Sequence, residues 1–243
     1  MNLRSLQKQW DSFGLEDPLR AILACAEVQD RPWDTARFFQ SGVVEIDSAL
    51  QYAESIHRLG QKKSALDFGC GVGRLTQALA AHFDRVCGVD LSPAMIQHAR
   101  RYNRQGDRCE YILNESGDLR RFPGDRFDFI YSSLTLQHMP PRFAARYIAE
   151  FLRILSPAGL LLFQLPSRRR GPLGWLRSGA PALLASLMHP FAPRAVMRGI
   201  PKQKVIRLLS QPAGEILDIA ADQSAGPAWE SFRYLVKKAA ARS

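Results

Sequence analysis

The sequence predicts a doubly wound α/β fold built on a mostly parallel, seven-stranded sheet. From residue 64 onward, short apolar runs alternate with segments of helical periodicity, and this alternation is typical of a parallel sheet with helices on both faces. Each run is almost continuously apolar, as expected for strands buried on both sides. The runs of strand length are residues 65–68, 86–89, 111–113, 127–131 and 160–165. Two further strand-like segments, 215–220 and 231–236, are expected to add an antiparallel edge.

The helical segments complete the predicted order. Helices are expected at residues 46–59, 72–81, 93–103, 142–155 and 201–210, with a shorter turn or helix around 117–121. The first 45 residues are rich in aromatic side chains and are predicted to form a cap of short helices. Residues 165–200 interrupt the alternation with proline, glycine and arginine, and we interpret them as a lid-like insertion after the fifth strand. The chain thus divides into a helical cap, 1–45, and a main domain, 46–243.

Composition narrows the class of protein. Of 243 residues, 46% are apolar and 23% are charged, which is an ordinary globular mixture, and no apolar run approaches the roughly 18 residues of a membrane span. The N-terminus lacks the apolar core of a signal peptide. The cysteines are scattered without a C-x-x-C pair, which argues against a zinc site and a disulfide framework. We therefore expect a cytoplasmic protein that holds no metal ion.

The positive charge is concentrated in one segment. The formal net charge is +10, and the segment 166–204 contains no acidic residue. Its basic residues are Arg168, Arg169, Arg170, Arg177, Arg194, Arg198, Lys202 and Lys204. Such an excess indicates an anionic partner or surface at this part of the chain.

A glycine-rich loop follows the first predicted strand, in the stretch ALDFGCGVGRL of residues 65–75. Gly69, Gly71 and Gly73 form a G-x-G-x-G pattern. A dinucleotide fingerprint has its third glycine one position later, where Arg74 stands here. Asp67 lies two residues before the loop, where a carboxylate would repel a pyrophosphate bound at the helix N-terminus. The loop therefore favours a ligand that carries positive charge.

A second acidic residue, Asp90, ends the next predicted strand, 21 residues after Gly69. An acid at this place reaches the ribose hydroxyls of a bound nucleoside. Asp90 is also a candidate cap for the following helix, but Ser92 followed by Pro93 suits that role better. A ligand with a ribose, an ammonium group and no phosphate satisfies both acids. S-adenosylmethionine (SAM) is such a ligand, and we predict it as the cofactor.

Several stretches together resemble a known family. ALDFGCGVGRL followed by VCGVDLSPAMIQHAR is similar to the first two motifs of class I SAM-dependent methyltransferases. FDFIYSSLTLQHMPP and FLRILSPAGLLLF resemble the regions around that family's fourth and fifth strands. The resemblance covers about residues 46–165 and extends to the remainder only by topology. It implies a Rossmann-like methyltransferase fold and an enzyme that transfers the methyl group of SAM.

The resemblance also implies which residues hold SAM. Asp67 is expected near the methionine ammonium group and Asp90 at the ribose hydroxyls. Leu91 would pack beside the adenine, and Asp118 with Leu119 would meet the adenine edge, although a helix cap or a solvated loop explains Asp118 equally well. The remaining expected contacts with the cofactor are Gly69, Cys70, Gly71, Gly73, Ser132 and Gln137.

Methyl transfer needs a base only when the acceptor must lose a proton. His138 follows the fourth predicted strand, whose carboxyl end faces the ligand crevice in such folds, and an imidazole with a pKa of about 6.5 suits proton transfer near neutral pH. We predict His138 as the catalytic base; the alternative is that it packs or holds its loop. Residues 132–135 lack the [DN]-P-P-[YF] motif of enzymes that methylate amino groups of nucleic-acid bases, and the chain has no Pro-Cys pair of a cytosine C5 enzyme.

The insertion supplies the candidate acceptor residues. Arg168 and the two following arginines are able to bind phosphate or carboxylate groups, although a solvated turn explains them as well. Trp175 belongs to a stretch of apolar and basic residues without an acid. That stretch fits a lid over a bulky acceptor, a packed helix pair, or a membrane-surface segment that reaches a lipid-linked acceptor. We predict Arg168 and Trp175 as acceptor-binding residues.

The predicted function is a SAM-dependent methyltransferase that acts on an oxygen atom of a small molecule, a sugar or a lipid-linked metabolite. Three alternatives stay open. An RNA methyltransferase is favoured by the net charge but not by the motifs. A nicotinamide-dependent oxidoreductase is disfavoured by Asp67 and Arg74. A SAM-binding module without catalytic activity is the third, and the sequence leaves the oligomeric state open.

Overall fold

A computed structural model describes residues 2–22, 34–171, 196–210 and 214–239. Within these ranges one mixed sheet has the strand order β3-β2-β1-β4-β5-β7-β6, with β1 to β5 parallel and β7 antiparallel to both of its neighbours. The strands are β1 (Ser64–Phe68), β2 (Arg85–Asp90), β3 (Cys109–Leu113), β4 (Phe127–Ser132), β5 (Leu155–Arg169), β6 (Gly214–Asp222) and β7 (Trp229–Lys238). The predicted mostly parallel, seven-stranded α/β fold is confirmed.

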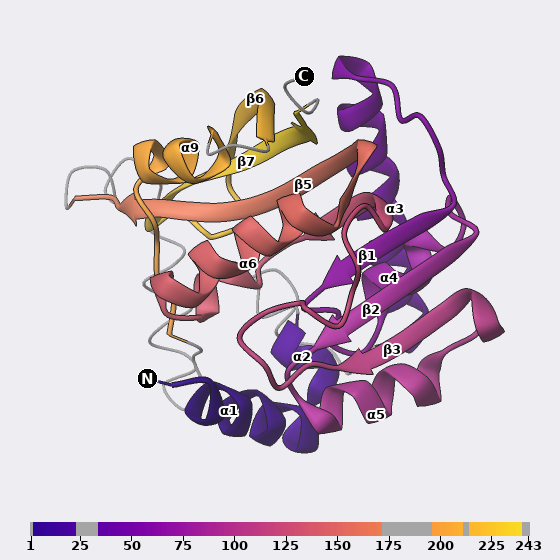
Figure 1. The fold of residues 1–243 in the computed structure, drawn as a ribbon. Coiled ribbons are helices and arrows are strands. Elements are labelled where there is room, and N and C mark those ends of the chain that lie inside the picture. Colours follow the sequence, from indigo (N-terminus) through magenta and orange to yellow (C-terminus); the bar gives the residue numbers. More distant parts are fainter. Residues whose placement is uncertain (1, 23–33, 172–195, 211–213, 240–243) are drawn as a thin grey trace.

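Helices cover both faces of this sheet (Figure 1). They are α1 (Leu3–Glu16), α2 (Pro18–Ile22), α3 (Thr35–Ile56), α4 (Arg74–Leu79), α5 (Pro93–Tyr102), α6 (Pro141–Ile154) and α9 (Lys202–Ser210). Helices α3, α4 and α5 contribute to one apolar cluster, whereas α6 and α9 contribute to another. Strand β5 shows why its sequence is continuously apolar: Leu160 and Leu162 belong to the first cluster, and Leu161 to the second. Successive side chains of a strand point to opposite faces, and here both faces are covered.

Short polar contacts fix the ends of these elements. Ser92 caps α5 by accepting a hydrogen bond from the Met95 N–H, with Pro93 in the first turn, as the sequence indicates. Asp128, at the start of β4, accepts hydrogen bonds from the backbone N–H groups of Lys63 and Ser64, both at 3.0 Å. Asp128 therefore ties the beginning of β1 to β4, which is a structural role.

Several boundaries differ from the prediction. Helix α3 begins at Thr35 rather than at residue 46, because Asp34 caps it and Phe38 with Gly42 continues its buried face. It therefore runs through residue 45, where the cap was divided from the main domain, and that division stays a prediction. Residues around 117–121 form bends and a turn, which is one of the two forms predicted for them. Strand β5 extends to Arg169 because β7 pairs with it along that length.

The two C-terminal strands form the expected antiparallel edge of the sheet. Strand β7 is inserted between β5 and β6, so the edge strand β6 runs parallel to β5. Among the described residues, no helix is long and apolar enough to cross a membrane.

Candidate functional site

The carboxyl ends of β1, β2 and β4 meet at one edge of the sheet, and helix α1 lies across this edge beside α5 (Figure 1). The glycine-rich loop leaves β1 here, Asp90 ends β2, and a short 3-10 helix, Leu136–His138, follows β4. In parallel α/β sheets, ligands bind at this edge. The sheet topology thus brings most of the predicted site residues together.

The glycine-rich loop has a backbone that only glycine adopts without strain. Gly69, Gly71 and Gly73 have φ angles of 81°, 51° and 85°, in the left-handed region. A Cβ atom on Gly69 would collide with the side chain of Thr135, and one on Gly71 would lie 2.6 Å from Ile22 of α2. The loop N–H groups of Gly69 and Cys70 both donate to the Val89 carbonyl, at 2.8 and 3.0 Å. The loop is therefore tight, tied to β2, and covered by the N-terminal helices.

Asp90 is held in place by backbone donors. Its Oδ2 accepts a hydrogen bond from the Gly71 N–H at 2.9 Å, and its Oδ1 accepts one from the Ser92 N–H at 2.8 Å. Burial raises the pKa of Asp90, and these N–H groups oppose that rise. The carboxylate thus connects the glycine loop to the start of α5.

Asp67 is the most deeply buried acid of this edge, with 1% of its surface exposed. Thr76 Oγ1 donates a hydrogen bond to its Oδ2 at 2.7 Å. Burial raises the pKa of Asp67 to about 7, against the lowering effects of Thr76 and of the Arg74 guanidinium. A buried carboxylate whose charged form is unfavourable gains most from a cationic ligand. Asp67 and Asp90 beside a glycine cradle therefore fit SAM, whose ammonium and ribose they would hold.

The adenine-edge residues have other partners in the structure. Asp118 forms ion pairs with Arg146, at 2.8 Å, and with Arg120, at 3.6 Å. Leu119 is fully buried, and its N–H donates to Glu150 Oε2 of α6 at 2.9 Å. Their contact with the cofactor stays a prediction. Glu115, which sequence analysis passed over, accepts a hydrogen bond from Gln7 Nε2 at 2.8 Å.

Helix α1 supplies residues that the sequence did not indicate. Gln7 Nε2 donates to the Leu91 carbonyl at 3.2 Å as well as to Glu115. Asp11 Oδ1 accepts a hydrogen bond from the Ala94 N–H at 2.8 Å, at the first turn of α5. Trp10 meets the His138 ring edge to face, with centroids 5.2 Å apart. Helix α1 thus contacts the loops after β2, β3 and β4, and these long-range pairings leave no local sequence signal.

A chain of hydrogen bonds determines which nitrogen of His138 carries a proton. The Leu134 N–H donates to Gln164 Oε1 at 3.2 Å, so the amide nitrogen of Gln164 faces Gln137 Oε1, at 3.3 Å. Gln137 therefore presents its own amide nitrogen to His138 Nε2, at 3.2 Å. Because that nitrogen donates, the neutral imidazole accepts at Nε2 and carries its proton on Nδ1.

The surroundings of His138 keep it neutral. Burial lowers its pKa to about 4, the backbone of Val196 raises it, and the positive charge of Arg198 lowers it further. Ser132, also predicted at this edge, is buried and donates to the Phe68 carbonyl at 3.1 Å. His138 is thus uncharged near neutral pH, and its Nε2 lone pair already has a donor.

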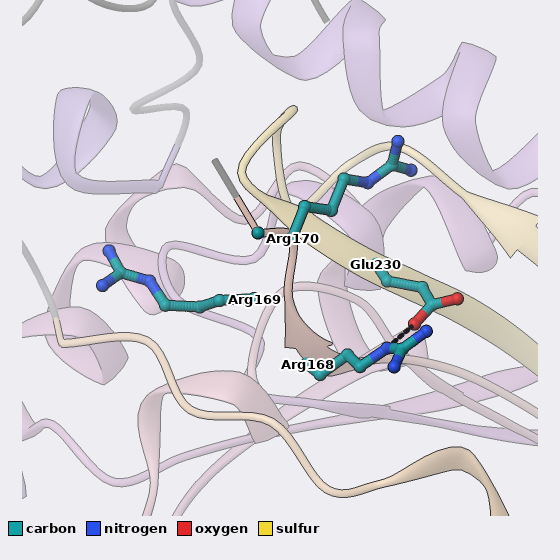
Figure 2. Close-up of a pocket in the computed structure, with 5 residues that line it drawn as sticks. Arg168, Arg169, Arg170 and Glu230 are labelled. Atoms are coloured by element: carbon teal, nitrogen blue, oxygen red, sulfur yellow. Dashed lines mark hydrogen bonds and ion pairs between the residues drawn. The ribbon is translucent and has the colours of Figure 1, made fainter. Parts of the chain in front are cut away.

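Three successive arginines surround an open pocket of about 470 Å³ at the end of β5 (Figure 2). Arg168 pairs with Glu230 of β7 at 2.6 Å. The Arg169 guanidinium lies 5.7 Å from the centre of the Trp229 ring, and Arg170 Nε donates to the Trp229 carbonyl at 3.1 Å. Figure 2 shows the side chains of the three arginines pointing in different directions. Trp175, the other predicted acceptor residue, lies outside the described residues.

Comparisons with known proteins agree with this geometry. Residues 65–159 match a family model described as a methyltransferase domain. Trans-aconitate 2-methyltransferase of Paracidovorax citrulli is 31% identical over 116 residues, which are 47% of this chain and 43% of that protein. Ubiquinone biosynthesis O-methyltransferase of Coxiella burnetii is 32% identical over 119 residues, which are 49% of this chain and 50% of that protein. The chain thus spans about half the length of the curated relatives it matches.

The fold has solved counterparts over nearly its whole length. The crystal structure of magnesium protoporphyrin IX methyltransferase from Synechocystis PCC 6803 with bound SAH superposes with a TM-score of 0.66 at 17% identity, covering 98% of this chain and 100% of that chain. At this identity the likeness concerns the fold. It places the strand order described above among methyltransferase structures.

Proposed function

We propose that this protein, whose residues 65–159 form the domain of a class I SAM-dependent methyltransferase, transfers a methyl group from SAM to an oxygen atom of a small-molecule, sugar or lipid-linked metabolite. The methyltransferase family and the SAM cofactor agree with the prediction from the sequence. The observation that carries the proposal is a pair of acids, the buried Asp67 and the partly buried Asp90, at the two sides of a glycine cradle. This pair suits a cationic nucleoside and not a pyrophosphate.

Each residue of the donor side has a proposed task. Asp67 orients the amino-acid end of SAM through its charge, Asp90 binds the ribose hydroxyls, and the glycines admit the ligand close to the backbone. Leu91 packs beside the adenine. When bound, SAM supplies a methyl group that is already activated by its sulfonium. The protein therefore contributes mainly by orienting the acceptor and excluding water.

His138 is the proposed base for an acceptor hydroxyl. Its Nε2 lies 3.2 Å from the Gln137 amide nitrogen, so it becomes available to an acceptor only when this contact opens. The carboxyl-edge position of the 3-10 helix that carries it supports the proposal. A role of His138 in holding the loop between Trp10 and Gln137 is the alternative.

The acceptor is proposed to carry an anionic group. Arg168 is already paired with Glu230, which leaves Arg169 and Arg170 as the stronger candidates for a carboxylate or phosphate. By their names, the relatives compared above act on trans-aconitate and in ubiquinone biosynthesis. Both a small acid and a lipid-like metabolite therefore stay candidate acceptors for this protein. Arg168 stays a proposed acceptor residue within this group.

A lipid-linked acceptor would bring the basic segment 166–204 to a membrane surface. The charged residues described in this segment are all basic: Arg168, Arg169, Arg170, Arg198, Lys202 and Lys204. Sedimentation with anionic vesicles at low salt tests this contact, and no co-sedimentation would remove it. The cytoplasm is the proposed compartment, because Cys70, Cys87 and Cys109 are free thiols.

Methyl-labelled SAM, incubated with the protein and a small-molecule extract of the host, tests the proposed reaction. Label is expected in an oxygen-linked methyl group of a metabolite, and the variant Asp67→Asn is expected to leave the extract unlabelled. Label in RNA, with retention that falls steeply with salt, would favour the RNA methyltransferase alternative. Tight SAM binding with no labelled acceptor would favour a module without catalytic activity.

A further inference from the structure

Arg74, the residue that follows the glycine loop, is a buried charge. Only 5% of its side chain is exposed. Its guanidinium donates to Glu45 Oε2 of α3 at 2.5 Å and to Ser41 Oγ at 3.2 Å. Helix α3 lies directly against it, since a Cβ atom on Gly42 would be 2.7 Å from the Arg74 carbonyl oxygen. A buried guanidinium needs such partners, so the end of the glycine loop is attached to α3.

Glu45 connects Arg74 to a second part of the same edge. Its other oxygen, Oε1, accepts a hydrogen bond from the Tyr131 hydroxyl at 3.0 Å. Tyr131 lies on β4 directly beside Asp67 of β1 in the sheet register. One carboxylate therefore holds the residue after the glycine loop and the strand neighbour of Asp67.

Glu45 and Arg74 also act on Asp67 through their charges. The charged groups that shift its pKa are Arg74, which lowers it, and Glu45 and Asp90, which raise it. Because Glu45 and Arg74 form an ion pair, their effects on Asp67 oppose each other. Removing the charge of Glu45 alone would leave Arg74 uncompensated and favour ionised Asp67.

We propose that Glu45 is a positioning residue for the methyl donor: by holding Arg74 and Tyr131, it keeps the glycine loop and Asp67 in the arrangement that the amino-acid end of SAM requires. Glu45 does not touch the reacting atoms in this proposal. It lies on α3, outside the motifs, and its role depends on residues 29 and 86 positions away.

Calorimetric titration of the full chain with SAM, across a range of pH, tests the proposal. Glu45→Gln is expected to weaken SAM binding about tenfold at pH 8, as for loss of a charged hydrogen bond. It is also expected to move the pH midpoint of binding downwards, because Asp67 ionises more readily. Tyr131→Phe changes no charge at this pH, so it should weaken binding about threefold without moving the midpoint.

Asp47→Asn is the matched control. Asp47 lies on the same helix and pairs with His82, beyond the far end of α4, at 2.8 Å. The Asp47→Asn variant should bind SAM with the affinity of the wild type. A folded Glu45→Gln protein with unchanged affinity and midpoint would overturn the proposal, and so would an equal loss in Asp47→Asn. If Glu45→Gln does not fold, unchanged SAM affinity in Tyr131→Phe would overturn it.

Discussion

Two regions at the carboxyl edge of the sheet are built in opposite ways. In the donor region, hydrogen-bond donors fix both acids: Thr76 donates to the buried Asp67, and two backbone N–H groups donate to the partly buried Asp90. At the end of β5, three arginines stand exposed around an open pocket, and one of them is partnered by Glu230. The first region holds its acids in a fixed geometry, as expected of a site for a single ligand, whereas the second presents exposed charge.

This difference indicates which of the two regions discriminates more strongly between ligands. Buried acids with fixed donors cannot adapt, because moving them would expose unpaired polar groups to a low-dielectric interior. Exposed arginines can reorient at little cost, so they accept anions of several shapes. We therefore expect large effects from changes in the donor region and small effects from changes at the β5 end.

Replacing His138 is expected to have the largest effect on turnover. As a base it contributes about 100-fold or more, so His138→Ala should lower kcat by that factor while SAM affinity stays unchanged. Because burial lowers its pKa to about 4, the rate should show no inflection near pH 6.5 that depends on His138. Such an inflection in the wild type, absent from the variant, would contradict the buried, neutral imidazole described here.

Asp67→Asn is expected to weaken SAM binding about 100-fold, as for truncation of one partner of a buried charged contact. Calorimetry measures this directly. Asp84→Asn is the control, since Asp84 is an exposed acid just before β2, at the opposite edge of the sheet. Equal SAM affinities in the Asp67→Asn and Asp84→Asn variants would contradict the expected importance of the donor region.

Gly69→Ala is expected to lower the free energy of unfolding by about 3 kcal/mol or more, because it adds a collision with Thr135 to an unfavourable φ. Gly106→Ala measures the cost of the unfavourable φ alone. Gly106 also has a positive φ, 56°, but a Cβ atom there meets nothing within 4 Å. About 1 kcal/mol is expected for it. Urea unfolding of both variants separates the two costs, and similar losses would show that the loop has room for a side chain.

The stability of the ligand-free protein should depend on Asp67 in a defined direction. The pKa of Asp67 is about 7 when folded and 3.8 as an ordinary aspartate, so the folded state binds this proton more tightly. The stability that protonated Asp67 contributes to the folded state is therefore greatest below about pH 4, and it is lost as the pH rises toward 7. Relative to Asp67→Asn, the wild type should lose about 2–4 kcal/mol over that range. Parallel stability profiles for the two proteins would show that Asp67 is already ionised.

The smallest effects are expected at the end of β5. Replacing both Arg169 and Arg170 by alanine should raise the KM for an anionic acceptor about threefold to tenfold, as for exposed charged contacts. Arg207→Ala, an exposed arginine of α9, serves as the control. Glu230→Gln should lower the KM slightly, because it frees Arg168. A hundredfold loss from the double variant would mean that this end is as preorganised as the donor region.

The parallel core was predictable because it depends on local patterns. Strands β1 to β4 are short and mostly buried, so their apolar runs mark them in the sequence. The acids of the donor region lie at the carboxyl ends of two of them. The length of strand β5 was underestimated because its last residues are held by β7, 60 or more positions away in the chain. The same holds for the start of α3, which continues a buried face that the sequence pattern showed only from residue 46.

The part of the site that escaped prediction is made of pairings between distant segments. Gln7 meets Glu115, Glu45 meets Arg74 and Tyr131, and Gln164 meets Gln137. Each is an ordinary polar residue within a helix, strand or loop, and only the fold gives it a partner. The tautomer of His138 depends on three hydrogen bonds in series, two of which join distant segments, and no spacing rule contains that information.

The position of β7 has a consequence for how the sheet is assembled during synthesis. One long edge of β5 is covered by residues 229–238, the last strand of the described chain to leave the ribosome. Among the described residues, β6 pairs with β7 alone. Until those residues emerge, a strand of fifteen residues with an apolar centre, residues 160–165, has an open edge, and such edges pair readily with other chains. Completion of the sheet is thus a late, non-local step. A nascent chain that stalls before residue 229 would be the species most exposed to aggregation.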